Sequence, residues 1–197
     1  ETKPLKIKIT RDIIKIKSVY AKTLNDNILF LRVASFDSKV TKDLKKYIKE
    51  HKEKTKGIIL DLRNNPGGLL NQAIDATDLF INEGTIVSQK GRDVQSEDKF
   101  TAKENTTVTE VPMVVLVNGG SASASEIVAG ALQDSKRAIV IGEKTFGKGS
   151  VQVVLPITID NKEGIKLTIA KYYLPSGRTI QAVGITPDIE SLSGKTI

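Results

Sequence analysis

Three loops of this 197-residue sequence carry the residue types that hydrolytic chemistry uses. The first is "NGGSASASE" (118–126), which places Ser121, Ser123 and Ser125 between a glycine pair and an expected helix. Ser123 and Glu126 also have the spacing of a capping box, in which the serine side chain binds a backbone N–H three residues on. From the residues alone, a serine of this loop is equally a nucleophile or a helix cap.

The second loop, "DLRNNPGG" (61–68), ends an expected strand with a proline and two glycines directly before a helix. The serine loop makes the same strand-to-helix turn. Two such turns place free backbone N–H groups at helix N-termini, where they can bind an anion or an oxyanion. Neither loop has the spacing of a phosphate-binding or dinucleotide-binding motif.

The third loop, "EKTFGKGSVQ" (143–152), places Lys148 between two glycines at the start of an expected strand. The two-residue period of a strand puts Lys148, Ser150 and Gln152 on one face. Taken alone, Lys148 is more simply a surface lysine on a turn. Together the three loops hold the parts of a serine–lysine hydrolase: a serine nucleophile, an amine that takes its proton, and backbone donors for an oxyanion.

The segments around these loops alternate between strand and helix, which predicts a layered α/β fold. Apolar runs rich in Val and Ile predict buried strands at 27–33, 57–63, 111–118, 137–143, 151–158 and 165–173. Helices are expected at 38–54, 69–82 and 124–134. The polar stretch 89–110 is expected to be a long excursion between elements, and the first twenty residues one or two strands with a solvated face.

Composition excludes several classes of function. The sequence has no cysteine, so disulfides, thiol nucleophiles and cysteine metal sites are impossible. The net charge of +7 arises largely from lysines between 39 and 56, where helical spacing puts them on a solvated face. With 5% aromatic residues and no basic stretch that carries stacking rings, nucleic-acid binding is not expected. The single histidine, His51, has no evident catalytic partner, so a base other than histidine is expected.

Four stretches in this order resemble the carboxyl-terminal processing proteases, also called tail-specific proteases, over about residues 5–188. They are "DLRNNPGG", "GSASASEIVAGALQD", "GEKTFGKGSVQ" and "YYLPSGRTIQAVGITPD". The resemblance implies a layered α/β core of ββα units, related in architecture to crotonases and Clp-type proteases. It also implies three parts: the end of a PDZ domain with a connecting strand (1–20), a serine protease core (21–190) and a C-terminal tail (191–197).

The resemblance assigns a Ser-Lys mechanism to this chain residue by residue. The positions that match the family's nucleophile, general base, lysine-orienting glutamine and oxyanion donors are Ser123, Lys148, Gln152, Ala124 and Gly67, with Gly68 as the alternative glycine. The nucleophile and the base are 148 − 123 = 25 residues apart, as in the family pattern. Glu126 also matches, with an expected structural role.

By resemblance, the activity is that of a serine endopeptidase that cleaves protein substrates near their C-terminus through an acyl-enzyme, without a cofactor or metal. The expected partners are proteins with accessible C-terminal tails, and a PDZ domain, missing from this sequence, is expected to gate them; a homo-oligomer is left open. An exported bacterial protein, periplasmic or at the cell surface, is implied. The alternatives are a non-catalytic binding module and a crotonase-like acyl-CoA enzyme.

This mechanism makes a demand on Lys148. A free lysine has a pKa of about 10.4, and a base useful near pH 7 needs one lower by roughly 3 units, which corresponds to about 4 kcal/mol. Burial against Phe146 and Val151 is expected to act in that direction. Gln152 can accept a hydrogen bond from the amine without adding a negative charge, which would hold the lysine protonated.

Overall fold

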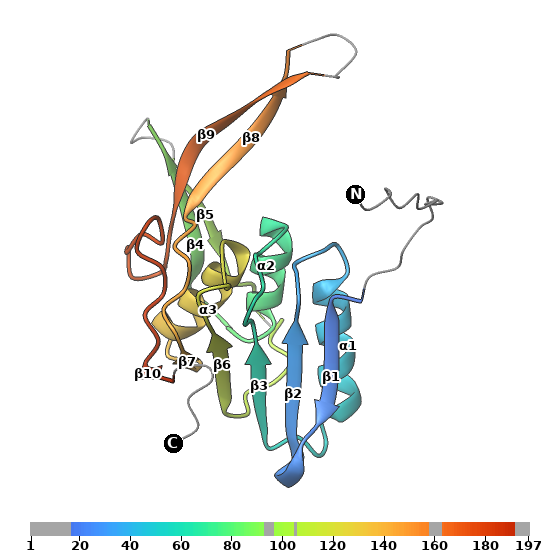
Figure 1. Ribbon diagram of the computed structural model, residues 1–197. Helices are drawn as coiled ribbons and strands as arrows, with labels where there is room; N and C mark the ends of the chain where they lie inside the picture. Colours follow the sequence, from blue (N-terminus) through green and yellow to red (C-terminus); the bar gives the residue numbers. More distant parts are fainter. Residues whose placement is uncertain (1–16, 93–96, 105, 158–162, 192–197) are drawn as a thin grey trace, which may run out of the picture.

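The computed structural model describes residues 17–92, 97–104, 106–157 and 163–191 (Figure 1). A six-stranded sheet forms the body of this part of the chain. Its strands in spatial order are β1 (Val19–Thr23), β2 (Ile28–Val33), β3 (Gly57–Asp61), β6 (Met113–Val117), β7 (Ile139–Gly142) and β10 (Ile189–Glu190). The strand β1 runs antiparallel to β2, and all the other neighbours are parallel.

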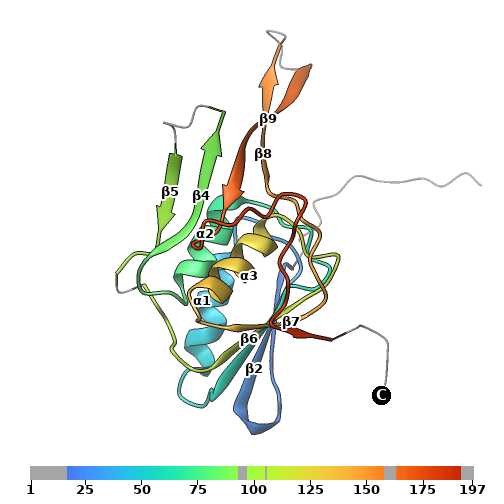
Figure 2. The same ribbon diagram turned by 90° about the vertical axis from the view of Figure 1, so that its left-hand side faces the viewer.

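Three α-helices pack against this sheet: α1 (Val40–His51), α2 (Leu70–Asp78) and α3 (Ala124–Asp134). The chain moves in one direction through β2, β3, β6 and β7, and right-handed crossovers then place the intervening helices on one face. Figure 2 shows the helices stacked on that side. In α1, Val40, Leu44 and Ile48 are buried at every fourth position, so the lysines between them lie on the outer face, as expected.

A second, four-stranded sheet is antiparallel throughout, in the order β5-β4-β9-β8. Its strands are β4 (Thr85–Gly91), β5 (Glu97–Thr101), β8 (Ser150–Pro156) and β9 (Gly164–Tyr173). The hairpin of β8 and β9 projects beyond the helices and the large sheet (Figure 1). The residues of this hairpin are therefore mostly exposed to solvent, unlike those of the large sheet.

The central strands and all three helices lie where the sequence predicts them, and α3 has the predicted bounds. The stretch 89–110, predicted as a long excursion between elements, is itself partly strand, because it contains the end of β4 and all of β5. Paired charges hold this polar hairpin together: Lys90 and Lys99 both form ion pairs with Glu97. Residues 1–16, on which most of the expected N-terminal strands fall, lie outside the described residues.

The prediction of burial is wrong for the two apolar runs that form β8 and β9. Val154 is 68% exposed, and Leu155 and Ile169 are each 49% exposed. An apolar run indicates a strand, but only the neighbouring elements decide whether the strand is covered. Among the described residues, no helix has the length and apolar character needed to cross a membrane.

A buried carboxylate ends β3, directly before the loop 62–69. Asp61 is fully buried and accepts two side-chain hydrogen bonds of 2.9 Å from Arg63, while Arg32 lies 3.7 Å away. Burial alone would raise the pKa of Asp61, but the hydrogen bonds and charge of Arg63, helped by Arg32, outweigh it and hold the pKa below its ordinary value. The carboxylate therefore stabilises the fold above the unfolded-state pKa of about 3.9.

We expect this stabilisation to disappear as the pH falls below about 4, through the lowered pKa of the folded state. Asp61→Asn should lower the free energy of unfolding at pH 7 by about 1.5 kcal/mol, at the low end for charged hydrogen bonds because both arginines are partly exposed to screening water. Urea unfolding of both proteins from pH 7 to pH 3 tests this. An equally steep acid decline in Asp61→Asn would contradict the role of Asp61.

Candidate active site

The glycine-rich loop and the serine loop meet at the carboxyl ends of β3 and β6. These strands are parallel neighbours, so the loops that follow them emerge at the same edge of the sheet. Asn64 and Asn118 join the loops reciprocally: the Asn64 N–H donates to Asn118 Oδ1 at 2.9 Å, and Asn118 Nδ2 donates to Asn64 Oδ1 at 3.0 Å. The Ala122 N–H adds a bond of 3.0 Å to the carbonyl of Asn65. The two predicted loops therefore form one site.

Two of the three serines serve to fasten these loops. The Ser121 hydroxyl donates to the carbonyl of Leu62 at 2.8 Å and accepts the Asn118 N–H at 3.1 Å. The Ser125 hydroxyl donates to the carbonyl of Asn65 at 2.9 Å. Both serines are fully buried, whereas Ser123 is partly exposed. Exposure and hydrogen bonding thus leave the middle serine as the one that can meet a substrate.

Ser123 has an unusual backbone conformation, with φ 56° and ψ −113°. A positive φ is strained for a residue other than glycine, and such strain gathers at functional sites. A serine on a sharp strand-to-helix turn is the arrangement that presents a nucleophilic hydroxyl. Ser123 is also the N-cap of α3, and its N–H donates to Glu126 Oε2 at 2.8 Å, which is the glutamate half of a capping box. Its hydroxyl has the capping-box position but makes no capping hydrogen bond of ordinary length, so it is not held as a cap.

The Glu126 carboxylate connects this turn to the lysine loop. Glu126 is fully buried, and its Oε2 accepts the backbone N–H groups of Ser123 and Lys148, both at 2.8 Å. Its Oε1 accepts the Gly147 N–H at 2.7 Å and the Thr145 hydroxyl at 2.6 Å. One carboxylate oxygen therefore holds the backbones of Ser123 and Lys148 together. Joining these two backbones is a structural role, as expected for Glu126.

The side chains of the expected dyad are not joined in the same way. Among the hydrogen bonds of the described residues, none links Ser123 to the Lys148 amine or to Gln152, and both of these long side chains are exposed. The expected burial of the amine by Phe146 and Val151 is not found, because Phe146 is 70% exposed and Val151 only half-buried. The structure fixes the backbone of Lys148 beside Ser123 and leaves its side chain in solvent.

The two expected oxyanion donors lie at the same place. The Gly67 turn contacts the start of α3 so closely that a Cβ at Gly67 would lie 2.9 Å from Ser123 Cβ and 3.0 Å from the Ala124 nitrogen. Asn65 Oδ1 accepts the Gly67 N–H at 2.9 Å. The N–H groups of Ala124 and Gly68, in contrast, have no acceptor within the described part of the chain.

A backbone bridge to Phe36 sets the direction of the Gly68 N–H, and the sequence gave no indication of this contact. The Phe36 N–H donates to the Gly67 carbonyl at 2.9 Å, and the Phe36 carbonyl accepts the Leu69 N–H at 2.8 Å. In such a parallel bridge the N–H of the intervening residue, Gly68, points away from Phe36. A backbone bridge of this kind leaves no signal in the residue types.

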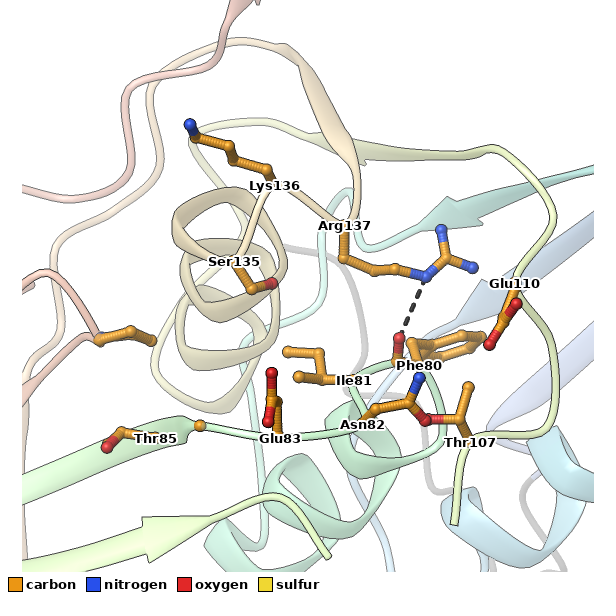
Figure 3. A pocket seen from close by; sticks show the side chains of 12 residues that line it. Phe80, Ile81, Asn82, Glu83, Thr85, Thr107, Glu110, Ser135, Lys136 and Arg137 are labelled. Atoms are coloured by element: carbon orange, nitrogen blue, oxygen red, sulfur yellow. Dashed lines mark hydrogen bonds between the residues drawn. The ribbon is translucent and has the colours of Figure 1, made fainter. Parts of the chain in front are cut away.

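A hollow of about 670 Å³ lies at the opposite end of α3, beyond Ser135 (Figure 3). Arg137 spans its wall and donates from Nε to the carbonyl of Phe80 at 3.0 Å. None of the residues predicted for catalysis lines this hollow. Among the described residues, no cluster of three or more His, Asp or Glu side chains could hold a metal ion.

Comparison with known proteins decides which family has this arrangement. Residues 27–191 match the model of peptidase family S41. The chain belongs to this family. The match includes the three loops, the four-stranded sheet and the six-stranded sheet except β1, so the S41 core comprises most of the chain.

Individual S41 relatives agree with this assignment. The chain is 53% identical over 192 residues to a carboxy-terminal-processing protease of Bartonella bacilliformis, which covers 95% of the chain and 44% of that protein. It is 40% identical to the carboxy-terminal processing protease CtpA of Bacillus subtilis, with 94% and 39% covered. The chain thus spans less than half the length of these relatives.

A solved structure supports the fold. The photosystem II D1 C-terminal processing protease superposes with a TM-score of 0.80 at 33% identity, over 90% of this chain and 49% of that one. The mixed α/β fold expected from the sequence is therefore that of an S41 protease core.

The different bonds of the two buried serines lead to a ranked prediction. Ser121→Ala removes an acceptor and leaves the Asn118 N–H without a partner, so we expect a loss of about 1–3 kcal/mol in the free energy of unfolding. Ser125→Ala removes only one donor, because the Asn65 carbonyl keeps the Ala122 N–H, and should cost about 1 kcal/mol. Chemical denaturation checks the order, and a reversed order would contradict it.

Glu126→Gln tests the carboxylate that joins the loops. An amide offers one acceptor oxygen where four donors converge, so at least one backbone N–H loses its partner, and we expect a loss of about 2 kcal/mol or more. Hydrogen exchange at the amides of Ser123 and Lys148 should accelerate with it. The control is Glu50→Gln on α1, an exposed i,i+4 pair with Lys46 that should change stability by less than about 0.5 kcal/mol. Equal effects of the two changes would contradict the role of Glu126.

Proposed function

We propose that this chain is the catalytic core of a C-terminal processing serine endopeptidase with a Ser-Lys mechanism. The Ser123 hydroxyl attacks the scissile carbonyl while the Lys148 amine accepts its proton, and the resulting lysine ammonium returns the proton to the leaving amine. Water then hydrolyses the acyl-enzyme, with Lys148 again acting as the base. The products are the two shortened polypeptides, and no cofactor enters either step.

The observation that carries this proposal is the shared bond to Glu126. The backbone N–H groups of Ser123 and Lys148 converge on one oxygen of a buried carboxylate. The backbones of a serine and a lysine 25 residues apart are thereby fixed side by side, and this serine is the one of the three serines in its loop that is partly exposed. Membership in family S41 agrees with this arrangement.

The donors that would stabilise the oxyanion are the N–H groups of Ala124 and Gly68. Both lack an acceptor in the described part of the chain; Ala124 directly follows Ser123, and Gly68 directly follows Gly67, whose turn contacts Ser123. Between the two glycines suggested by the sequence, hydrogen bonding favours Gly68, because Asn65 already accepts the Gly67 N–H. Donors with no prior partner reorganise least as charge develops in the transition state.

The dyad then closes by rotation of the Lys148 side chain, without movement of its backbone. The amine is on a flexible stem in solvent, and the proposed acceptor of its hydrogen bond is Gln152, four residues further along, which is also exposed. The substrates of the whole protein are inferred to be polypeptides with accessible C-terminal tails. A PDZ domain that ends near residue 20 and gates these substrates, and export to the periplasm or cell surface, are further parts of the proposal.

Covalent labelling with a fluorophosphonate, together with cleavage of an unstructured peptide, tests the assignment of Ser123 and Lys148. Ser123→Ala and Ser123→Asn should abolish both, although asparagine tolerates a positive φ and can cap α3. Lys148→Arg should also be inactive, because arginine retains its proton at any usable pH.

Ser125→Ala is the matched control, since it removes a neighbouring serine hydroxyl that the nucleophile assignment does not need. It should keep substantial labelling and cleavage, and melting curves should show that every variant is folded. An active Lys148→Arg protein would exclude Lys148 as the base. A Ser123→Ala protein that still cleaves while Ser125→Ala does not would move the nucleophile to Ser125.

A further inference from the structure

The two peptide groups that meet at Lys148 are held by different partners. A peptide group is planar, so fixing both planes at one Cα fixes φ and ψ there, and with them the direction in which the side chain leaves the backbone. In the first plane the Lys148 N–H donates to Glu126 Oε2 at 2.8 Å. In the second plane the Gly149 N–H donates to Gln181 Oε1 at 3.0 Å. Glu126 therefore sets only one of the two planes, and Gln181 sets the other.

The Gln181 side chain provides the acceptor that the Gly149 N–H needs. Gly149 is buried, and a buried N–H without a partner is costly. No backbone carbonyl of the described residues accepts this N–H. Because an N–H can only donate, the amide oxygen of Gln181, and not its amide nitrogen, must face Gly149.

The segment 180–185 packs directly on the lysine loop. The Ala182 N–H donates to the Gly147 carbonyl at 2.8 Å. Thr145 and Ile185 form two bonds: the Thr145 N–H donates to the Ile185 carbonyl at 3.1 Å, and the Ile185 N–H donates to Thr145 Oγ1 at 2.6 Å. The amide of Gln181 is thus one of several contacts between this segment and the lysine loop, and the one that reaches the peptide group after Lys148.

The glycines on both sides of Lys148 permit this close approach. A Cβ at Gly149 would lie 2.4 Å from the backbone nitrogen of Gln181, and a Cβ at Gly147 would lie 3.2 Å from that of Val183. The first distance is far shorter than any real contact of a Cβ. A larger residue at position 149 would therefore displace Gln181 from the lysine loop.

The turn that carries Gln181 is itself held in a fixed conformation. The N–H groups of Val183 and Gly184 both donate to the Ile180 carbonyl, at 3.0 and 2.9 Å. Ala182, which is exposed, has φ 60°, a conformation that is strained for alanine and persists only where the surrounding contacts impose it. Gln181 therefore acts from a constrained turn.

We propose that Gln181 is a positioning residue for Lys148: its amide oxygen fixes the peptide group that follows the lysine and so sets the direction of the lysine side chain; this rests on the proposed function. Glu126 places the Lys148 backbone beside that of Ser123, and Gln181 limits the arc over which the amine can search for the Ser123 hydroxyl. Loss of the Gln181 oxygen releases the second plane and leaves the first one held.

Hydrogen exchange of the full chain tests the contact. Gln181→Met keeps the length of the side chain but removes the acceptor, so the Gly149 amide should exchange about tenfold faster or more. The Lys148 amide, which Glu126 holds, should change by less than about threefold. Gln181→Glu restores an acceptor of the same length and should restore slow exchange at Gly149. Unchanged exchange at Gly149 in Gln181→Met would overturn the proposal.

Gln133→Met is the matched control, because Gln133 binds the chain directly after the same segment. Its Nε2 donates to the Thr186 carbonyl at 3.0 Å and to Asp188 Oδ1 at 2.9 Å. This change also removes side-chain hydrogen bonds but leaves both peptide planes at Lys148 held. The melting temperature should fall in both methionine variants, whereas exchange at Gly149 should accelerate in Gln181→Met alone.

The rate of fluorophosphonate labelling of Ser123 shows whether this position matters for catalysis. Labelling should be about tenfold slower in Gln181→Met and within about twofold of the unsubstituted rate in Gln133→Met. In cleavage of an unstructured peptide, kcat should fall by a similar factor while KM changes little, because Gln181 acts through Lys148 and not on the substrate. Equal labelling by the two variants, or a slowing in both that follows the melting temperature, would overturn the proposal.

Failure of the proposed function would give a different result. If Ser123 of the unsubstituted chain is not labelled while Gly149 exchange responds to Gln181→Met, the Ser-Lys mechanism fails and Gln181 is only an anchor of the loop. If the unsubstituted chain is labelled and Gln181→Met is labelled equally fast, the mechanism stands and Gln181 has no part in it.

Discussion

The site depends on a buried carboxylate, that of Glu126, which forms no ion pair within the described residues. Burying a charge is costly unless hydrogen bonds replace the lost water, and Glu126 receives four, three of them from backbone N–H groups. The four donors are dipoles that the fold holds in place. They carry no net charge, so they do not neutralise the carboxylate, and they cannot move far from it. As a result the carboxylate sets the distance between two backbone segments: the strained turn at Ser123 and the glycine-flanked segment at Lys148. The N–H of Ser123 itself donates to this carboxylate, so the bond is made at the strained turn.

The run of small residues around Ser123 follows from how closely the loops approach. Gly67 contacts Ser123 at a distance that a larger residue would not permit, and the buried hydroxyls of Ser121 and Ser125 reach carbonyl groups of the neighbouring loop. A larger apolar residue at either serine position would separate the loops, and alanine would leave them less firmly joined. The three serines therefore have different roles: Ser121 and Ser125 bind the neighbouring loop, and Ser123 between them is partly exposed.

Local patterns in the sequence predicted much of this arrangement. The bounds of α3 could be predicted because a capping residue marks its start and the helical period of apolar residues marks its extent. The positions of the loops could be predicted because they follow buried strands and contain glycine pairs. Other features depend on partners distant in sequence. The polar strand β5 is stable only beside β4, the apolar β8 is exposed because nothing in the described chain packs on it, and Phe36 positions Gly68 through backbone atoms alone. The spacing of apolar residues along the sequence does not indicate such contacts.

The contrast between a fixed backbone and a free lysine side chain indicates where the final step of assembly occurs. The two backbones and the free N–H groups are in place without substrate, whereas the Lys148 side chain is exposed. The cover that Phe146 and Val151 do not provide is thus the part of the expected site that the described residues leave open. Because Glu126 fixes the backbones of Ser123 and Lys148, what remains free to move toward Ser123 is the lysine side chain.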